Sequence, residues 1–217
     1  MTRPDTLFDH LVWATPDLDA GTAAIEERLG LRVAPGGRHP GVGTHNAVFA
    51  LGDRFADDRS YFEILAPDPT QDRLWSFGRR LRGLDAPGFV GWACRTDDAR
   101  ATARAAKTAG LGPGMVLSMS RQRPDGSVVS WRLFEVEVHG FGALLPFFVE
   151  WRDGGHPCER LPDSECDLAA LRLETPEPDA LRSALDALGV VAPEIRPSET
   201  PGIVAVLDAP SGRVELR

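Results

Sequence analysis

The sequence has few of the residues that would assign it to a disulfide-rich, zinc-binding or membrane class. Its three cysteines, Cys94, Cys158 and Cys166, form no Cys-x-x-Cys pair, so neither a disulfide framework nor a structural zinc site is expected. No apolar run approaches the length of a membrane span, and residues 1–8 lack the basic and apolar regions of a signal peptide. We therefore expect a cytoplasmic protein without a membrane partner.

Basic charge and nucleotide-binding motifs are also scarce. The net charge of -8 argues against nucleic acid as a partner. The sequence has no Gly-x-Gly-x-x-Gly after a strand, no Gly-Lys-Ser/Thr phosphate loop and no Gly-x-Ser-x-Gly elbow. These absences argue against nucleotide-dependent and serine-hydrolase chemistry.

What the sequence does contain is one pattern that occurs three times. Each copy opens with a short apolar strand, runs through an acidic turn into a helix, and closes on a strand that carries a glutamate. The opening strands are 8–14, 89–94 and 168–173, and the closing strands are 61–65, 147–151 and 213–216. A repeat of about 50–80 residues whose sheet cannot bury its own face predicts modules packed side by side, with room for a pocket between them. Only the first opening strand holds a histidine, so we do not expect the modules to be chemically equivalent.

Local signals place one helix in each module and predict the order β-α-β-β-β. In the first module Asp17 is a helix-cap candidate, and Gly30 follows the last apolar residue of the helical pattern. Apolar residues at helical spacing between 67 and 87 predict a connecting helix, and the polar, Pro- and Gly-rich stretch 153–167 predicts a linker. The predicted modules are residues 5–67, 85–157 and 165–217.

Several of these segments resemble the vicinal oxygen chelate superfamily, which includes glyoxalase I, extradiol dioxygenases and bleomycin-resistance proteins. The resemblance rests on Asp-His-Leu-Val-Trp-Ala at 9–14 and Tyr-Phe-Glu-Ile-Leu at 61–65. The glyoxalase-like domain branch is matched by Gly-Gly-Arg-His-Pro at 36–40, Gly-Thr-His-Asn at 43–46, Pro-Phe-Phe-Val-Glu-Trp at 146–151 and His-Pro at 156–157. The resemblance implies an α+β fold in which βαβββ modules pair into a curved, cup-shaped mixed sheet with helices outside. Residues 5–157 would form the two-module glyoxalase-like domain, and 165–217 a third, smaller module.

The same resemblance implies a divalent metal, Fe, Mn, Ni or Zn, inside the cup. Its ligand positions fall on His10 and Glu63 in the first module and on Glu150 in the second. The fourth position falls on Phe89 or Gly91, and neither residue can bind a metal. One nitrogen and two carboxylates suit these metals and leave positions open for a bidentate substrate. The alternative is a hydrogen-bonded core histidine with two glutamates that anchor the scaffold.

Four other residues are candidates for substrate binding. His45 lies on a central strand, where it would either complete a two-histidine, one-carboxylate site or, as we favour, line the pocket and bind substrate. Arg121 could hold a carboxylate or phosphate, or be a solvated hairpin arginine. Trp131 could line an apolar pocket or belong to the core. His156 could act as a proton carrier at the cavity mouth or make its loop rigid.

Together these features predict a metal-dependent enzyme of lyase, isomerase or dioxygenase type that acts on a small oxygen-chelating metabolite. Glu63 or Glu150 would be its general base if not a permanent metal ligand. The alternative is a metal-free protein that binds or sequesters a small molecule, as in bleomycin resistance. We expect the third module either to cover an open sheet edge or to pair with its copy in a homodimer.

Overall fold

The computed structural model describes residues 6–53, 60–71, 81, 83–123, 126–138 and 140–217. Most of the predicted connecting helix lies outside these residues. The first module contains β1 (Thr6–Ala14), α1 (Leu18–Leu29), β2 (Ala34–His39), β3 (Thr44–Asp53) and β4 (Ser60–Pro67). The second contains β5 (Gly88–Thr96), α3 (Ala99–Thr108), β6 (Gly112–Pro113), β7 (Leu117–Gln122), β8 (Val128–Phe134), β9 (Val136–Val138), the short 3-10 helix η1 (Gly142–Leu144) and β10 (Phe147–Trp151). A second 3-10 helix, η2 (Pro157–Glu159), leads to the third module of β11 (Asp167–Thr175), α4 (Pro178–Leu188), β12 (Glu194–Pro197), β13 (Gly202–Ala209) and β14 (Gly212–Leu216).

The helices begin and end at the residues that local chemistry favours. The Asp17 carboxylate accepts a hydrogen bond from the first turn of α1, and Asp98 does the same for α3. Helix α1 ends at Gly30 and α4 at Gly189, both in the left-handed region with φ of 71° and 76°. The order β-α-β-β-β recurs along the chain, so the predicted α+β fold with repeated βαβββ modules is confirmed.

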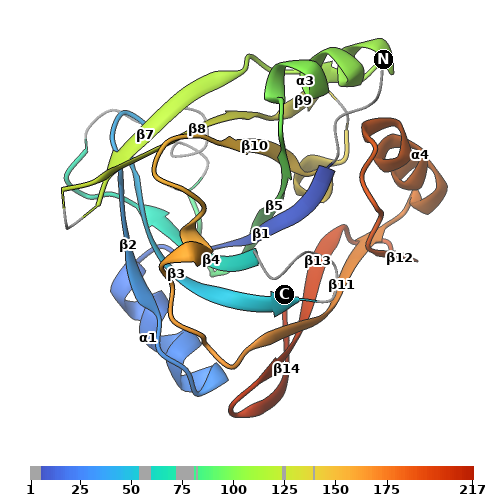
Figure 1. Ribbon diagram of the computed structural model, residues 1–217. Coiled ribbons are helices and arrows are strands. Elements are labelled where there is room, and N and C mark those ends of the chain that lie inside the picture. Colours follow the sequence, from blue (N-terminus) through green and yellow to red (C-terminus); the bar gives the residue numbers. More distant parts are fainter. Residues whose placement is uncertain (1–5, 54–59, 72–80, 82, 124–125, 139) are drawn as a thin grey trace.

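The strands form a curved mixed sheet around a central space, with α1, α3 and α4 on the outside (Figure 1). The sheet runs in the order β14-β13-β11-β3-β4-β1-β5-β10-β8-β7, with β2 added to β3 and β12 to β11. The first two modules meet where β1 and β5 pair antiparallel, and each closing strand lies parallel to its opening strand, β4 beside β1 and β10 beside β5. Because β2 also contacts β7, the cup is nearly closed.

The third module packs against the outside of this cup. Its first strand continues the sheet through a short parallel pairing with the end of β3, beyond the stretch that β2 occupies. Apolar residues of α4, such as Leu181 and Leu185, share one core cluster with Ile25 and Leu29 of α1 and Ala103 of α3. Burial of apolar surface therefore joins all three modules. A homodimer stays a prediction, and sedimentation as a monomer would contradict it.

Within the described residues, no helix combines the length and the apolar character that crossing a bilayer requires.

Candidate functional site

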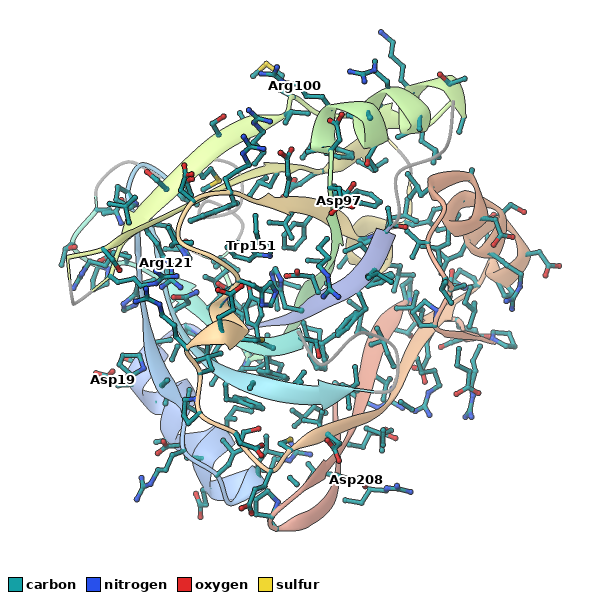
Figure 2. The ribbon with its side chains drawn as sticks, in the orientation of Figure 1. Asp19, Asp97, Arg100, Arg121, Trp151 and Asp208 are labelled. Carbon is teal, nitrogen blue, oxygen red and sulfur yellow. The ribbon has the colours of Figure 1, made fainter. Side chains whose placement is uncertain are left out.

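The concave side of the sheet forms a cavity of about 290 Å³ between the first and second modules. Its wall is mainly apolar and includes Val12, Val48, Leu65, Leu117, Met119, Leu133, Phe147 and Val149. A smaller polar set faces the same space: His10, His39, Thr44, Asn46, Tyr61, Glu63, Arg121 and Glu135. Figure 2 labels two of the lining residues, Arg121 and Trp151. A concave, mainly apolar pocket with a few convergent polar groups is the usual form of a small-molecule site.

His10 and Glu63 face each other in this cavity. They lie on the parallel strands β1 and β4, where Glu63 is in register with Val12, two residues beyond His10. Nε2 of His10 lies 3.7 Å from Oε2 of Glu63, and the two residues are 3% and 8% exposed. The ring of Tyr61 stacks on the His10 imidazole with centroids 4.4 Å apart. The structure thus brings together the two first-module residues that the sequence singled out.

Asp9, which the sequence analysis missed, holds the other side of the His10 ring. The pairing of β1 with β5 shifts register between Phe8 and His10, which leaves Asp9 as the extra residue of a β-bulge. Its fully buried carboxylate lies 2.5 Å from Nδ1 of His10 and accepts hydrogen bonds from Nε1 of Trp151 (3.0 Å) and Nε2 of His156 (3.2 Å). The sequence offered one signal for this role, since Asp9 is an acidic residue next to the histidine of an apolar strand.

These hydrogen bonds determine the charge of Asp9 and the tautomer of His10. Burial raises the pKa of the Asp9 carboxyl, but the hydrogen bonds from His10 and His156 outweigh it and hold that pKa well below its usual range. The ionised carboxylate accepts the Nδ1–H of His10, so Nε2 is the nitrogen that faces the cavity. His156 is oriented in turn because its Nδ1 accepts the backbone N–H of Cys158.

His156 therefore has a different place from the one predicted. It is 5% exposed and does not line the cavity, because its ring is turned toward Asp9. The predicted contact with substrate is corrected to a buried contact that supports Asp9.

Gly36 and Gly37 on β2 lie close to two polar side chains of the cavity, Asn46 and Arg121. Oε1 of Glu63 accepts a hydrogen bond from Nδ2 of Asn46 on β3 (2.5 Å), another residue that the sequence analysis left without a role. A Cβ at Gly36 would lie 2.0 Å from Oδ1 of Asn46, and one at Gly37 would lie 2.8 Å from Nη1 of Arg121. A Cβ at either position would have to displace one of these two polar groups, so glycine at 36 and 37 keeps both of them in place.

Arg121 and Trp131 both line the cavity, as predicted for substrate-binding residues. Arg121 comes from β7 and is 9% exposed, and within the described residues its Nη1 has no hydrogen-bond partner. Trp131 comes from β8, is 8% exposed, and contacts the ring of Trp151 with centroids 5.8 Å apart. Trp131 is thus both part of a buried cluster and part of the cavity wall.

His45 and Glu150 do not reach the cavity. Thr44 and Asn46 line it from β3, and strand alternation turns His45, which lies between them, to the other face. Val149 and Trp151 line it from β10, so Glu150 also points to the outer face.

On that outer face Glu150 anchors α3. It accepts hydrogen bonds from the backbone N–H of Ala99 (3.1 Å) at the first residue of α3, from Arg132 (3.2 Å) and from Arg152 (2.8 Å). This corrects the predicted role of Glu150 as a metal ligand or general base: its carboxylate caps a helix and neutralises two arginines.

The residues present do not fit the predicted His10/Glu63/Glu150 metal site. The second-module positions on the cavity side of β5 and β10 are Gly91, opposite Val12, and Val149, and neither supplies a donor atom. In the part of the chain that the structure describes, no three His, Cys, Asp or Glu side chains cluster in a way that could hold an ion. His10 and Glu63 alone are fewer ligands than such metals usually take from a protein.

Comparison with solved structures finds the same fold elsewhere. A hypothetical protein from Staphylococcus aureus superposes with a TM-score of 0.66 at 14% identity, over 97% of this chain and 84% of that one. A variant of the methylmalonyl-CoA epimerase of Streptomyces coelicolor, in complex with 2-nitronate-propionyl-CoA, superposes with a TM-score of 0.51 at 22% identity, over 70% of this chain and 98% of that one. At these identities the similarity concerns the fold.

A comparison with curated proteins finds no match. The glyoxalase-like domain family matches residues 8–189, which covers the cavity, both modules around it and the beginning of the third. The family match, the repeated βαβββ modules and the cup-shaped sheet agree with one another, and the chain belongs to the glyoxalase-like domain family of the vicinal oxygen chelate superfamily.

Proposed function

We propose that the cavity is a catalytic site in which Glu63 and His10 transfer a proton on a small molecule, in a reaction of isomerase or lyase type. The observation that carries this proposal is the pair of facing atoms, Nε2 of His10 and Oε2 of Glu63, 3.7 Å apart in a mainly apolar cavity. This separation is too long for a good hydrogen bond, so an atom of a ligand can interact with both groups.

The two side chains are suited to different parts of such a transfer. Glu63 is held through Oε1 by Asn46, which leaves Oε2 to accept a proton from a carbon next to a carbonyl group. His10 is oriented by Asp9, which accepts its Nδ1–H, so the ring donates a hydrogen bond from Nε2 to the oxygen of the resulting enolate in its doubly protonated form. The proton on Glu63 then returns to the substrate carbon, so the site ends as it began.

Proton exchange provides the test. Uncharged ketones and esters with acidic α-hydrogens, and the matching keto acids, are incubated with the protein in D₂O, and loss of the α-proton signal is followed by ¹H NMR. Glu63→Gln should slow the exchange by about 10²–10⁴-fold, because the carboxylate that accepts the proton is removed. As a control, Glu194→Gln on the exposed strand β12 should leave the exchange rate unaltered. Exchange by Glu63→Gln at the wild-type rate would contradict the proposal.

The second candidate is a protein that binds its ligand without chemistry. It is favoured by the apolar wall and by the paired rings of Trp131 and Trp151, which suit a flat apolar ligand. Compounds that bind in the cavity but show no exchange with wild-type protein would support this candidate over catalysis.

A further inference from the structure

Arg121 brings a positive charge to the cavity, and one nitrogen of its guanidinium group has no hydrogen-bond partner among the described residues. Of the residues that line the cavity, all within the described part of the chain, it is the single arginine or lysine. Its guanidinium remains charged at any ordinary pH. It is 9% exposed, and the Nη1 atom has no hydrogen-bond partner among the described residues. A buried N–H group without a partner lowers stability, so this arrangement suits a site that is completed by a ligand.

We propose that the molecule bound in this cavity is a small apolar carboxylic acid whose carboxylate binds Arg121 and whose body extends toward His10 and Glu63. The inference deepens the proposed function, since it names the class of substrate on which the pair would act. A carboxylate supplies two oxygens in the plane of the guanidinium group, which matches the paired N–H donors of arginine.

The charges around the cavity favour a monoanion over a phosphate. Glu63 and Glu135 are acidic and also face the space, so Arg121 is opposed by two carboxyl groups. His39 adds no positive charge at neutral pH, because burial lowers the pKa of its imidazole despite the nearby Glu63. One guanidinium can neutralise one carboxylate, whereas a dianion keeps a second, unpaired negative charge that both glutamates repel.

The wall and the size of the cavity define the rest of the ligand. Apart from the polar set, the lining is aliphatic or aromatic, and Trp131 and Trp151 offer flat ring surfaces. A volume of about 290 Å³ lies at the lower end of the range for small-molecule sites. A short branched or aromatic acid fits this combination better than a long or polar one.

Gly37 is part of the same arginine site. A Cβ at this position would lie 2.8 Å from Nη1 of Arg121. The backbone of Gly37 lies outside the left-handed region, so alanine is tolerated by the main chain. Gly37→Ala therefore displaces the guanidinium and leaves its charge in place, which separates position from charge.

Binding of matched probes tests the inference. Benzoate, phenylacetate and isobutyrate are titrated against the protein by calorimetry, beside the neutral benzamide and the dianionic phenyl phosphate. We expect a carboxylate to bind wild-type protein at least about tenfold more tightly than the amide, as a charge-assisted hydrogen bond implies. Arg121→Gln should weaken carboxylate binding by about 10–100-fold and leave the amide unchanged. The carboxylate affinity of Arg121→Lys should lie between those of wild type and Arg121→Gln, because the positive charge stays and the planar pair of N–H donors is lost.

Two further variants make the result specific. Arg123→Gln removes the same charge two residues away, outside the cavity lining, and should bind carboxylates as wild type does. Glu63→Gln removes the proton acceptor and one of the two opposing carboxyl groups, so it should bind carboxylates at least as tightly as wild type does, which separates failure of this inference from failure of the proton-transfer proposal. If Arg121→Gln does not fold, Gly37→Ala replaces it, with a loss of carboxylate affinity expected.

Three results would overturn the inference. The first is carboxylate and amide affinities that are equal, or carboxylates that fail to bind at millimolar concentration. The second is carboxylate binding that survives both Arg121→Gln and Gly37→Ala. The third is tighter binding of phenyl phosphate than of benzoate, which would assign the site to phosphate esters.

Discussion

Replacement of Asp9 by asparagine should move a proton on His10 from one ring nitrogen to the other. In the wild-type protein one carboxylate oxygen accepts from His10 and the other from Trp151 and His156. Asparagine keeps one acceptor and turns the other into an NH₂ donor. Trp151 can only donate, and His156 must donate because its Nδ1 accepts from Cys158. The amide oxygen therefore stays with these two residues, and the NH₂ group faces His10.

His10 can satisfy that NH₂ group only if its Nδ1 becomes an acceptor. In Asp9→Asn we thus expect the neutral His10 ring to carry its proton on Nε2, toward Glu63, instead of on Nδ1. Long-range ¹H–¹⁵N NMR correlations of the imidazole nitrogens distinguish the two tautomers. Retention of the Nδ1–H form in the variant would refute this reasoning.

The same substitution has a stability cost that follows from the three contacts. A hydrogen bond to a charged group contributes about 1.5–3 kcal/mol and a neutral one about 0.5–1.5 kcal/mol, so three bonds lose roughly 3 kcal/mol. Part of this is offset because a neutral amide is less costly to bury than a carboxylate. We expect urea unfolding to report a loss of about 1–3 kcal/mol. Asp208→Asn, at an exposed ion pair with Arg213, is the control and should stay within about 0.5 kcal/mol.

The acid dependence should change in the same variant. The pKa of Asp9 is lower in the folded chain than in the unfolded chain. Its contribution to stability is therefore complete above the unfolded pKa of about 3.9 and is lost progressively as the pH falls below that value. Asp9→Asn should lose less stability than wild type between pH 5 and about pH 3. Parallel stability curves over this range would contradict the assigned charge of Asp9.

Three further predictions concern the rest of the site. Protein purified without chelator should carry well under one divalent metal per chain by elemental analysis, and His10→Ala should not change that value, because too few donors of the described residues converge at His10. A stoichiometric metal lost in the variant would contradict this. Gly36→Ala should destabilise the fold by about 1–3 kcal/mol in urea, since its Cβ would lie 2.0 Å from Oδ1 of Asn46, whereas Gly91→Ala, whose Cβ meets nothing within 4 Å, should be neutral. Glu150→Gln should lower the melting temperature through its weakened contacts with α3 yet keep any proton-exchange activity, and loss of activity with unchanged stability would return this glutamate to the site.

Strand alternation explains which site residues the sequence could not assign. His45 and Glu150 were placed in the cup, yet each lies one position away from a residue that lines it, Asn46 and Val149. A shift of one residue along a strand exchanges its two faces, and no local signal in the sequence states which face is concave. Only the packing of the two modules decided between them.

The sequence by itself determined the order of the elements and the repetition of the βαβββ module. Those features follow from caps and apolar spacing, which act over a few residues. The resemblance to the family added His10 and Glu63 as candidates for one site. The tertiary structure decided the rest: a bulge in β1 brings Asp9 to His10, residue 156 approaches Asp9 from the far end of the domain, and Gly37 admits Arg121 to the cavity. Each of these contacts joins segments whose approach depends on how the whole sheet curves, and a linear pattern carries no record of that curvature.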